Sequence, residues 1–80
     1  MPKNKKRETL RTLFGRRIKA LRLAAKLTQE ELSERAAISV DFLSLIERGR
    51  NSPSFENIES LALALDLPVS MLFAFDEERR

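Results

Sequence analysis

The sequence of 80 residues predicts an all-α fold of five helices, and three observations support this prediction. Apolar residues recur at helical spacing in several segments. The chain has two glycines only. Capping residues stand in front of most of the apolar segments, where helices usually begin. We find no strand pattern between them, so the sequence indicates one helical domain.

The first helix is expected from about Thr9 to Ala25. Its apolar residues fall on one stripe, namely Leu10, Leu13, Phe14, Ile18, Leu21 and Ala25. Its basic residues fall elsewhere, namely Arg11, Arg16, Arg17 and Lys19. One side of the helix should therefore cover the core, and the other should carry charge.

The second helix is expected from Thr28 to about Ala36, because Thr28 and Glu31 have the spacing of a capping box. Leu27 before the cap and Leu32 after it form a hydrophobic staple, which fixes how the chain enters the helix.

The third helix is expected from about Val40 to Arg48, with Ser39 as its N-cap and Gly49 as its left-handed stop. Few residues separate it from the second helix, so the two must cross at a large angle.

Two further helices complete the prediction. Ser54 is expected to cap the fourth helix, whose apolar stripe is Phe55, Ile58, Leu61, Ala62 and Leu65. A short last helix is expected to start near Pro68 and to carry Val69, Met71, Leu72 and Phe73. Together these elements place a helical domain at residues 9–75, with a basic arm at residues 1–8 and a charged tail at residues 76–80.

Charge is distributed unevenly along the chain. Residues 1–26 carry ten basic residues against one acid, a net charge of +9, whereas residues 27–80 carry five against eleven, a net charge of −6. Such an asymmetry indicates one surface that meets a polyanion. The alternative is a solvated basic tail followed by an ordinary charged helix face.

Composition excludes several classes of protein. The chain has no cysteine and no histidine, which excludes disulfides, the usual zinc sites and histidine-based catalysis. Neither a glycine-rich phosphate loop nor a nucleophile–base pair is present, so we expect no enzyme activity and no cofactor.

The apolar runs fall short of the roughly 20 residues that span a bilayer. The basic N-terminus lacks the apolar stretch of a signal peptide, and a cytoplasmic protein is expected.

The outward face of the third helix carries short and partly apolar side chains, namely Val40, Asp41, Ser44 and Leu45. A purely structural helix should expose long charged residues there. Short side chains can lie close to base edges, where aliphatic groups meet thymine methyls and a serine hydroxyl bonds to several bases.

The chain resembles the Xre family of phage-repressor and Cro-type DNA-binding proteins. Four motifs carry the resemblance in order: GRRIKALR at residues 15–22, LTQEEL at 27–32, LSLIERG at 43–49 and PSF at 53–55. The resemblance implies a five-helix lambda-repressor-like domain that binds double-stranded DNA and regulates transcription. The last two predicted helices are also similar to those of restriction-modification controller proteins.

The resemblance also implies roles for individual residues. Gln29 matches a glutamine that bonds a DNA phosphate and supports the recognition helix, which agrees with the affinity of helix N-termini for anions. The base-facing positions are Ser39, Val40, Asp41, Ser44 and Leu45. The positions that grip the DNA backbone are Arg48, Arg50, Asn51 and Ser52. Arg22 and Glu47 match a structural pair that joins the first helix to the end of the third.

Three residues depart from the family pattern. Ala37 occupies a turn position that glycine usually fills, and a positive φ there would cost on the order of 1 kcal/mol. The base-facing positions include Asp41, which phosphate repels, and no arginine, lysine, glutamine or asparagine. Phe42 lacks the hydroxyl of the usual tyrosine. We therefore expect weaker base specificity and a larger contribution from the basic arm.

The remaining expectations concern partners. Lys3, Lys5, Lys6 and Arg7 have the composition of a repressor arm that wraps the duplex. Met71, Phe73 and Phe75 are candidates for a two-fold contact, and the homodimer would bind an inverted-repeat operator. The alternative is a protein-interaction module, an antitoxin or adaptor. The net negative charge of residues 27–80 and Asp41 favour it, whereas the basic first third of the chain, Gln29 and the loop at residues 48–51 favour DNA.

Overall fold

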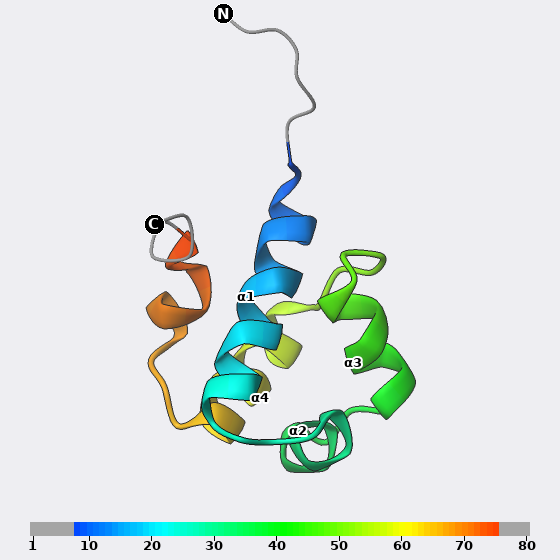
Figure 1. Cartoon of the computed structure of the whole chain (residues 1–80), viewed down its shortest axis with the longest axis vertical. Helices are drawn as coiled ribbons and strands as arrows, with labels where there is room; N and C mark the ends of the chain where they lie inside the picture. Colours follow the sequence, from blue (N-terminus) through cyan, green and yellow to red (C-terminus); the bar gives the residue numbers. More distant parts are fainter. Residues whose placement is uncertain (1–7, 76–80) are drawn as a thin grey trace, which may run out of the picture.

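The computed structural model describes residues 8–75 and contains four α-helices followed by a 3-10 helix (Figure 1). Their bounds are α1 Leu10–Ala24, α2 Gln29–Ala36, α3 Val40–Glu47, α4 Phe55–Leu65 and η1 Val69–Phe73. This part of the chain contains no strand, so the all-α prediction is confirmed. The last segment is a 3-10 helix, so the predicted count of five helices is not confirmed as five α-helices. None of the helices described has the length and apolar character required to cross a bilayer.

The helices begin at the residues that the sequence predicts. Thr28 Oγ1 accepts the N–H of Glu31 at 3.0 Å, and Glu31 Oε1 accepts the N–H of Thr28 at 2.9 Å, which completes the capping box. Ser54 forms a second reciprocal pair with Asn57. Ser39 Oγ accepts the N–H of Phe42 at 3.0 Å. These caps satisfy donors that a helix N-terminus otherwise leaves unpaired.

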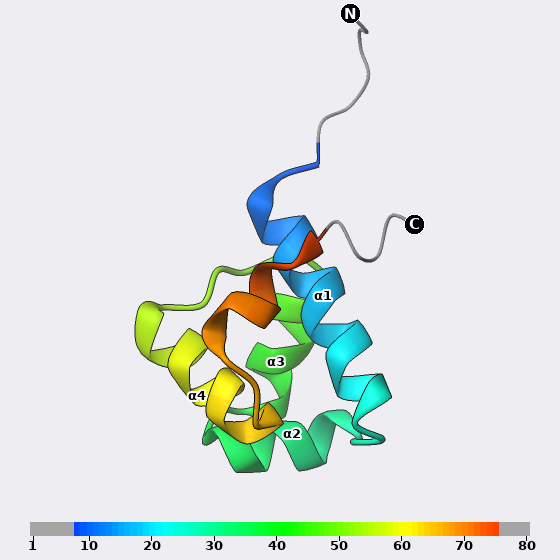
Figure 2. The same cartoon turned by 90° about the vertical axis from the view of Figure 1, so that its left-hand side faces the viewer.

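The core lies where four helices and η1 meet. α1 packs against α3 and η1, and α2 packs against α3 and α4. Figure 2 shows η1 passing over the side of α1. Six large side chains are fully buried, namely Ile18, Leu32, Leu43, Ile46, Leu61 and Leu72. They come from every helical element, so the core holds α2 and α3 in one fixed arrangement.

Burial differs from the sequence prediction at four positions, one of which is Ala25, expected on the stripe of the first helix but exposed. Leu10 is 61% exposed and Phe55 is 83% exposed, although both were expected on apolar stripes. Each is the first residue of its helix. The apolar stripe of the helix extends there beyond the element that packs against it. Arg17 was expected off the core, but it is buried and its Nε donates to the Met71 carbonyl oxygen at 2.9 Å. That hydrogen bond attaches η1 to α1.

Ala37 has the left-handed conformation that its turn position requires, with φ 59° and ψ 41°. An alanine there carries strain of about 1–2 kcal/mol. We predict that Ala37→Gly raises the free energy of unfolding by about 0.5–1 kcal/mol, because relief of strain exceeds the added entropy of the unfolded chain. Thermal unfolding of both proteins measures the difference. A lower melting temperature in the glycine variant would mean that the turn is unstrained.

Candidate nucleic-acid interface

α2, the turn and α3 form a helix-turn-helix whose inner faces are buried. Leu32 and Ala36 of α2 lie in the core with Leu43 and Ile46 of α3. The chain reverses at Ala37, and the Ile38 N–H donates to the Ser33 carbonyl oxygen at 3.0 Å. The outer face of α3 is thereby held in a fixed direction, away from the core.

That outer face carries the side chains that the sequence assigns to base contact. Val40 and Asp41 are exposed, and Ser44 and Leu45 are half-buried. Asp41 lies in the first turn of α3, where a carboxylate is also favoured by the helix dipole. Its presence is therefore explained in part by helix stability. The remaining side chains offer methyl groups and one hydroxyl, which suit thymine methyls and base-edge acceptors.

Ser39 has a structural task at the same site. Its Oγ caps α3 by accepting the Phe42 N–H, although its own hydroxyl proton can still be donated. Phe42 is half-buried and packs against the core. The ring thus anchors α3 to the core.

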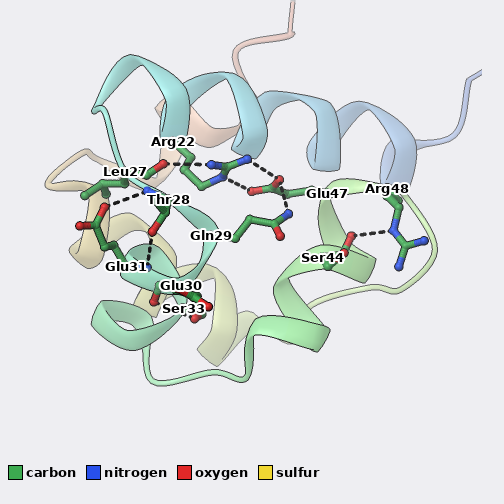
Figure 3. A network of polar contacts seen from close by, with 10 residues as sticks. All are labelled: Arg22, Leu27, Thr28, Gln29, Glu30, Glu31, Ser33, Ser44, Glu47 and Arg48. Atoms are coloured by element: carbon green, nitrogen blue, oxygen red, sulfur yellow. Dashed lines mark hydrogen bonds and ion pairs between the residues drawn. The ribbon is translucent and has the colours of Figure 1, made fainter.

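A buried polar network joins the ends of three helices (Figure 3). The Arg22 guanidinium donates from Nε to Glu47 Oε2 at 2.7 Å and from Nη2 to Glu47 Oε1 at 3.1 Å. Its Nη1 donates to the Leu27 carbonyl oxygen at 2.9 Å. Gln29 Nε2 donates to Glu47 Oε1 at 3.0 Å. The predicted Arg22–Glu47 pair is therefore present, and Gln29 is attached to it.

The loop between α3 and α4 carries the polar residues expected to contact the DNA backbone. Arg48, Arg50, Asn51 and Ser52 are all exposed. Arg48 Nε donates to the Ser44 carbonyl oxygen at 3.3 Å, and Asn51 Oδ1 accepts the Ser52 N–H at 2.8 Å.

Gly49, with φ 73°, allows this loop to approach α1. A Cβ built at Gly49 would lie 3.0 Å from the Thr12 Cα. The loop therefore starts beside the first turns of α1 (Figure 1). The arm residues Lys3, Lys5, Lys6 and Arg7 lie outside the described residues.

A mainly apolar groove adjoins the end of the loop between α3 and α4. It encloses about 280 Å³ and is lined by Leu10, Arg11, Phe14, Ser52, Pro53, Phe55, Ile58 and Phe73. Phe73 is 37% exposed, and its ring centroid lies 5.1 Å from that of Phe14. Of the other predicted contact residues, Met71 and Phe75 are half-buried. The sequence missed Leu10 and Phe55 here, because helical spacing alone placed both in the core.

Comparison with known proteins identifies the fold. Residues 13–74 match the family described as a helix-turn-helix domain. The chain belongs to this helix-turn-helix family. The resemblance to Xre-type regulators that the motifs indicated is confirmed. The match covers every helix described here except the first three residues of α1.

Two curated relatives and one solved structure show the similarity in detail. The immunity repressor protein of Bacillus phage phi105 is 47% identical over 58 residues, 72% of this chain and 40% of the repressor. The transcriptional regulator ClgR of Mycobacterium tuberculosis is 36% identical over 70 residues, 88% of this chain and 62% of ClgR. The crystal structure of the restriction-modification controller protein C.AhdI from Aeromonas hydrophila is 37% identical, with a TM-score of 0.76. That similarity covers 78% of this chain and 94% of C.AhdI.

Proposed function

We propose that this helix-turn-helix protein regulates transcription by binding double-stranded DNA sequence-specifically as a homodimer, with α3 in the major groove. The observation that carries the proposal is the uncovered outer face of α3, whose short side chains are supported from behind by the core. A helix presented in this way can lie close enough to base edges for direct contact. The names of the relatives, a phage repressor and a transcriptional regulator, support the same function.

Individual residues take separate tasks in this proposal. Val40, Asp41, Ser44 and Leu45 contact bases, and Ser39 contributes its hydroxyl proton while it caps α3. Gln29 and the loop residues Arg48, Arg50, Asn51 and Ser52 contact phosphates. Phosphate contacts fix the position of α3 but carry no sequence information themselves. Because the base-facing set is small and includes an acid, a large share of the affinity should come from the phosphate contacts.

The second copy is proposed to dock on the apolar groove that contains Phe73. Exposed Phe55 lines this groove and exposed Val69 lies beside it, so both extend the apolar surface beyond the C-terminal residues that the sequence indicated. A two-fold contact pairs this surface with itself and sets the separation of the two recognition helices. Half-sites on the operator are expected roughly 34–36 Å apart, one helical turn.

The basic arm is proposed to add phosphate contacts. We predict that deleting residues 2–7 weakens DNA binding and makes its salt dependence shallower, since each lost contact removes about 0.9 from the slope. Titrations of the full chain and the deletion variant at several salt concentrations measure both slopes. An unchanged slope would show that the arm does not contact DNA.

In vitro selection tests the proposed function directly. The full chain is incubated with a pool of random duplexes at about physiological salt, and the retained DNA is sequenced. Enrichment of an inverted repeat is the expected result, and the repeat spacing tests the two-fold arrangement. Binding without enrichment would reduce the function to non-specific DNA association. Retention of no DNA would favour the protein-interaction alternative.

A further inference from the structure

We propose that Glu47 is a positioning residue for DNA binding: it fixes the side-chain amide of Gln29 so that one N–H is held ready for a phosphate. This inference rests on the proposed function, because it assigns a second role to the Gln29–phosphate contact. The resemblance implied that Gln29 bonds a phosphate and supports the recognition helix, and that Glu47 forms a structural ion pair with Arg22, without linking Gln29 to Glu47. The hydrogen bond between them joins the two tasks.

The chemistry of the two groups dictates which way the amide faces. Glu47 forms a two-point pair with the Arg22 guanidinium, so its carboxylate can only accept hydrogen bonds. Gln29 must therefore present its nitrogen, as it does at 3.0 Å. The opposite orientation would place two acceptor oxygens against each other with no proton between them. One amide N–H is thus committed to Glu47, and the oxygen is turned away.

The second N–H of the amide is left for a partner outside the protein. Gln29 is half-buried at the start of α2, and its amide makes no other hydrogen bond within residues 8–75. A phosphate oxygen is an acceptor, so it suits this N–H. The backbone N–H groups at the start of α2 favour an anion in the same place. A glutamine held in advance also loses less rotamer freedom on binding than a free one.

Arg22 makes this arrangement compatible with an anionic ligand. A lone carboxylate close to a phosphate would repel it, but the guanidinium neutralises Glu47 through two hydrogen bonds. The same guanidinium holds the Leu27 carbonyl oxygen just before the cap of α2. The network is therefore attached to α1 through Arg22, to α3 through Glu47 and to the start of α2 through the Leu27 carbonyl oxygen (Figure 3).

Nuclear magnetic resonance on the free protein tests the first half of the inference. The two side-chain amide protons of Gln29 should have well-separated shifts, with the proton bonded to Glu47 moved downfield. In the double variant Arg22→Met/Glu47→Leu this proton should return to the range of exposed glutamines. Removing both charges together avoids leaving one of them buried without a partner. Wild-type shifts like those of exposed glutamines would overturn the inference without any folded variant being needed.

Neutral phosphate substitution tests the second half. Operator duplexes that each carry a single methylphosphonate identify the phosphate whose charge Gln29 needs. Wild-type protein should bind that duplex roughly tenfold more weakly than the unmodified one, as expected for one hydrogen bond to a charged group. Gln29→Met, which lacks the amide, should show a clearly smaller ratio at that position. The double variant should show the same reduction, while ratios at all other phosphates stay as in wild type.

The outcomes separate this inference from the proposed function. If the network is merely structural, the double variant should bind every duplex more weakly by the same factor and should keep the Gln29-dependent ratio. That result would overturn the positioning role alone. If no phosphate shows a Gln29-dependent ratio, the inference also fails, although sequence-specific binding can stand. If wild-type protein binds none of the duplexes, the proposed function fails together with the inference.

Discussion

Replacing Gly15 with alanine is expected to lower the free energy of unfolding by about 3 kcal/mol, through overpacking at the contact between α1 and α3. A Cβ built at Gly15 would lie 2.1 Å from the Ile46 carbonyl oxygen and 3.0 Å from that of Glu47. Both atoms belong to the backbone at the end of α3, so no side-chain rotation can relieve the clash. The helices would have to separate until the contact reaches ordinary van der Waals distance.

Two opposing effects decide the sign of this substitution. Alanine favours an α-helix over glycine by about 1 kcal/mol, so Gly15→Ala at an exposed position would stabilise α1. Displacing α3 instead disturbs the core at Ile46 and the ion pair of Glu47 with Arg22, and this loss is larger. The melting temperature should fall on the order of 15 °C for a domain of this size.

Thermal unfolding and DNA titration of Gly15→Ala provide the measurement. Lys19→Ala is the matched control, because Lys19 is an exposed residue of the same helix and such changes alter stability by about 0.5 kcal/mol or less. DNA binding should weaken even below the melting temperature, since α3 is displaced. A variant as stable as the wild type would mean that α1 and α3 are not in close contact at Gly15.

Features set by neighbours in the sequence could be predicted from the sequence. The Thr28 and Ser39 caps depend on contacts with the residue three positions later, so their spacing identified them. The left-handed conformation of Ala37 was indicated by the resemblance to a family in which glycine usually fills this turn position. The Arg22–Glu47 pair was found through the resemblance to a family and not through spacing, because the two residues lie 25 positions apart.

Features that depend on how elements meet were missed. Helical spacing placed Leu10 and Phe55 on apolar stripes, but no stripe shows how far the neighbouring helix extends. The contact of Gln29 with Glu47 and the approach of α3 to Gly15 join segments distant in the sequence, and nothing local marks either. The last helix was expected without its 3-10 geometry. It spans five residues and has no side-chain cap, so it lacks the local signals that set α2 and α3.

Replacing Phe55 with serine is expected to prevent dimerisation and to weaken operator binding on the order of 100-fold, because paired half-sites no longer reinforce each other. Phe55 is 83% exposed at the start of α4, so its removal should barely change the stability of one subunit. In a two-fold interface the same substitution acts on both copies. Phe73 is a less selective target, because its ring also packs against Phe14.

Leu63→Ser provides the control for Phe55→Ser. Leu63 belongs to the same helix and is 81% exposed, but it does not line the groove. Sedimentation equilibrium should find monomers for the Phe55 variant and dimers for the Leu63 variant. Binding to an isolated half-site should be the same for both, since α3 is untouched. If the Phe55 variant remains dimeric, the two-fold contact lies elsewhere. If its half-site binding falls as far as its operator binding, Phe55 acts on DNA and not on dimerisation.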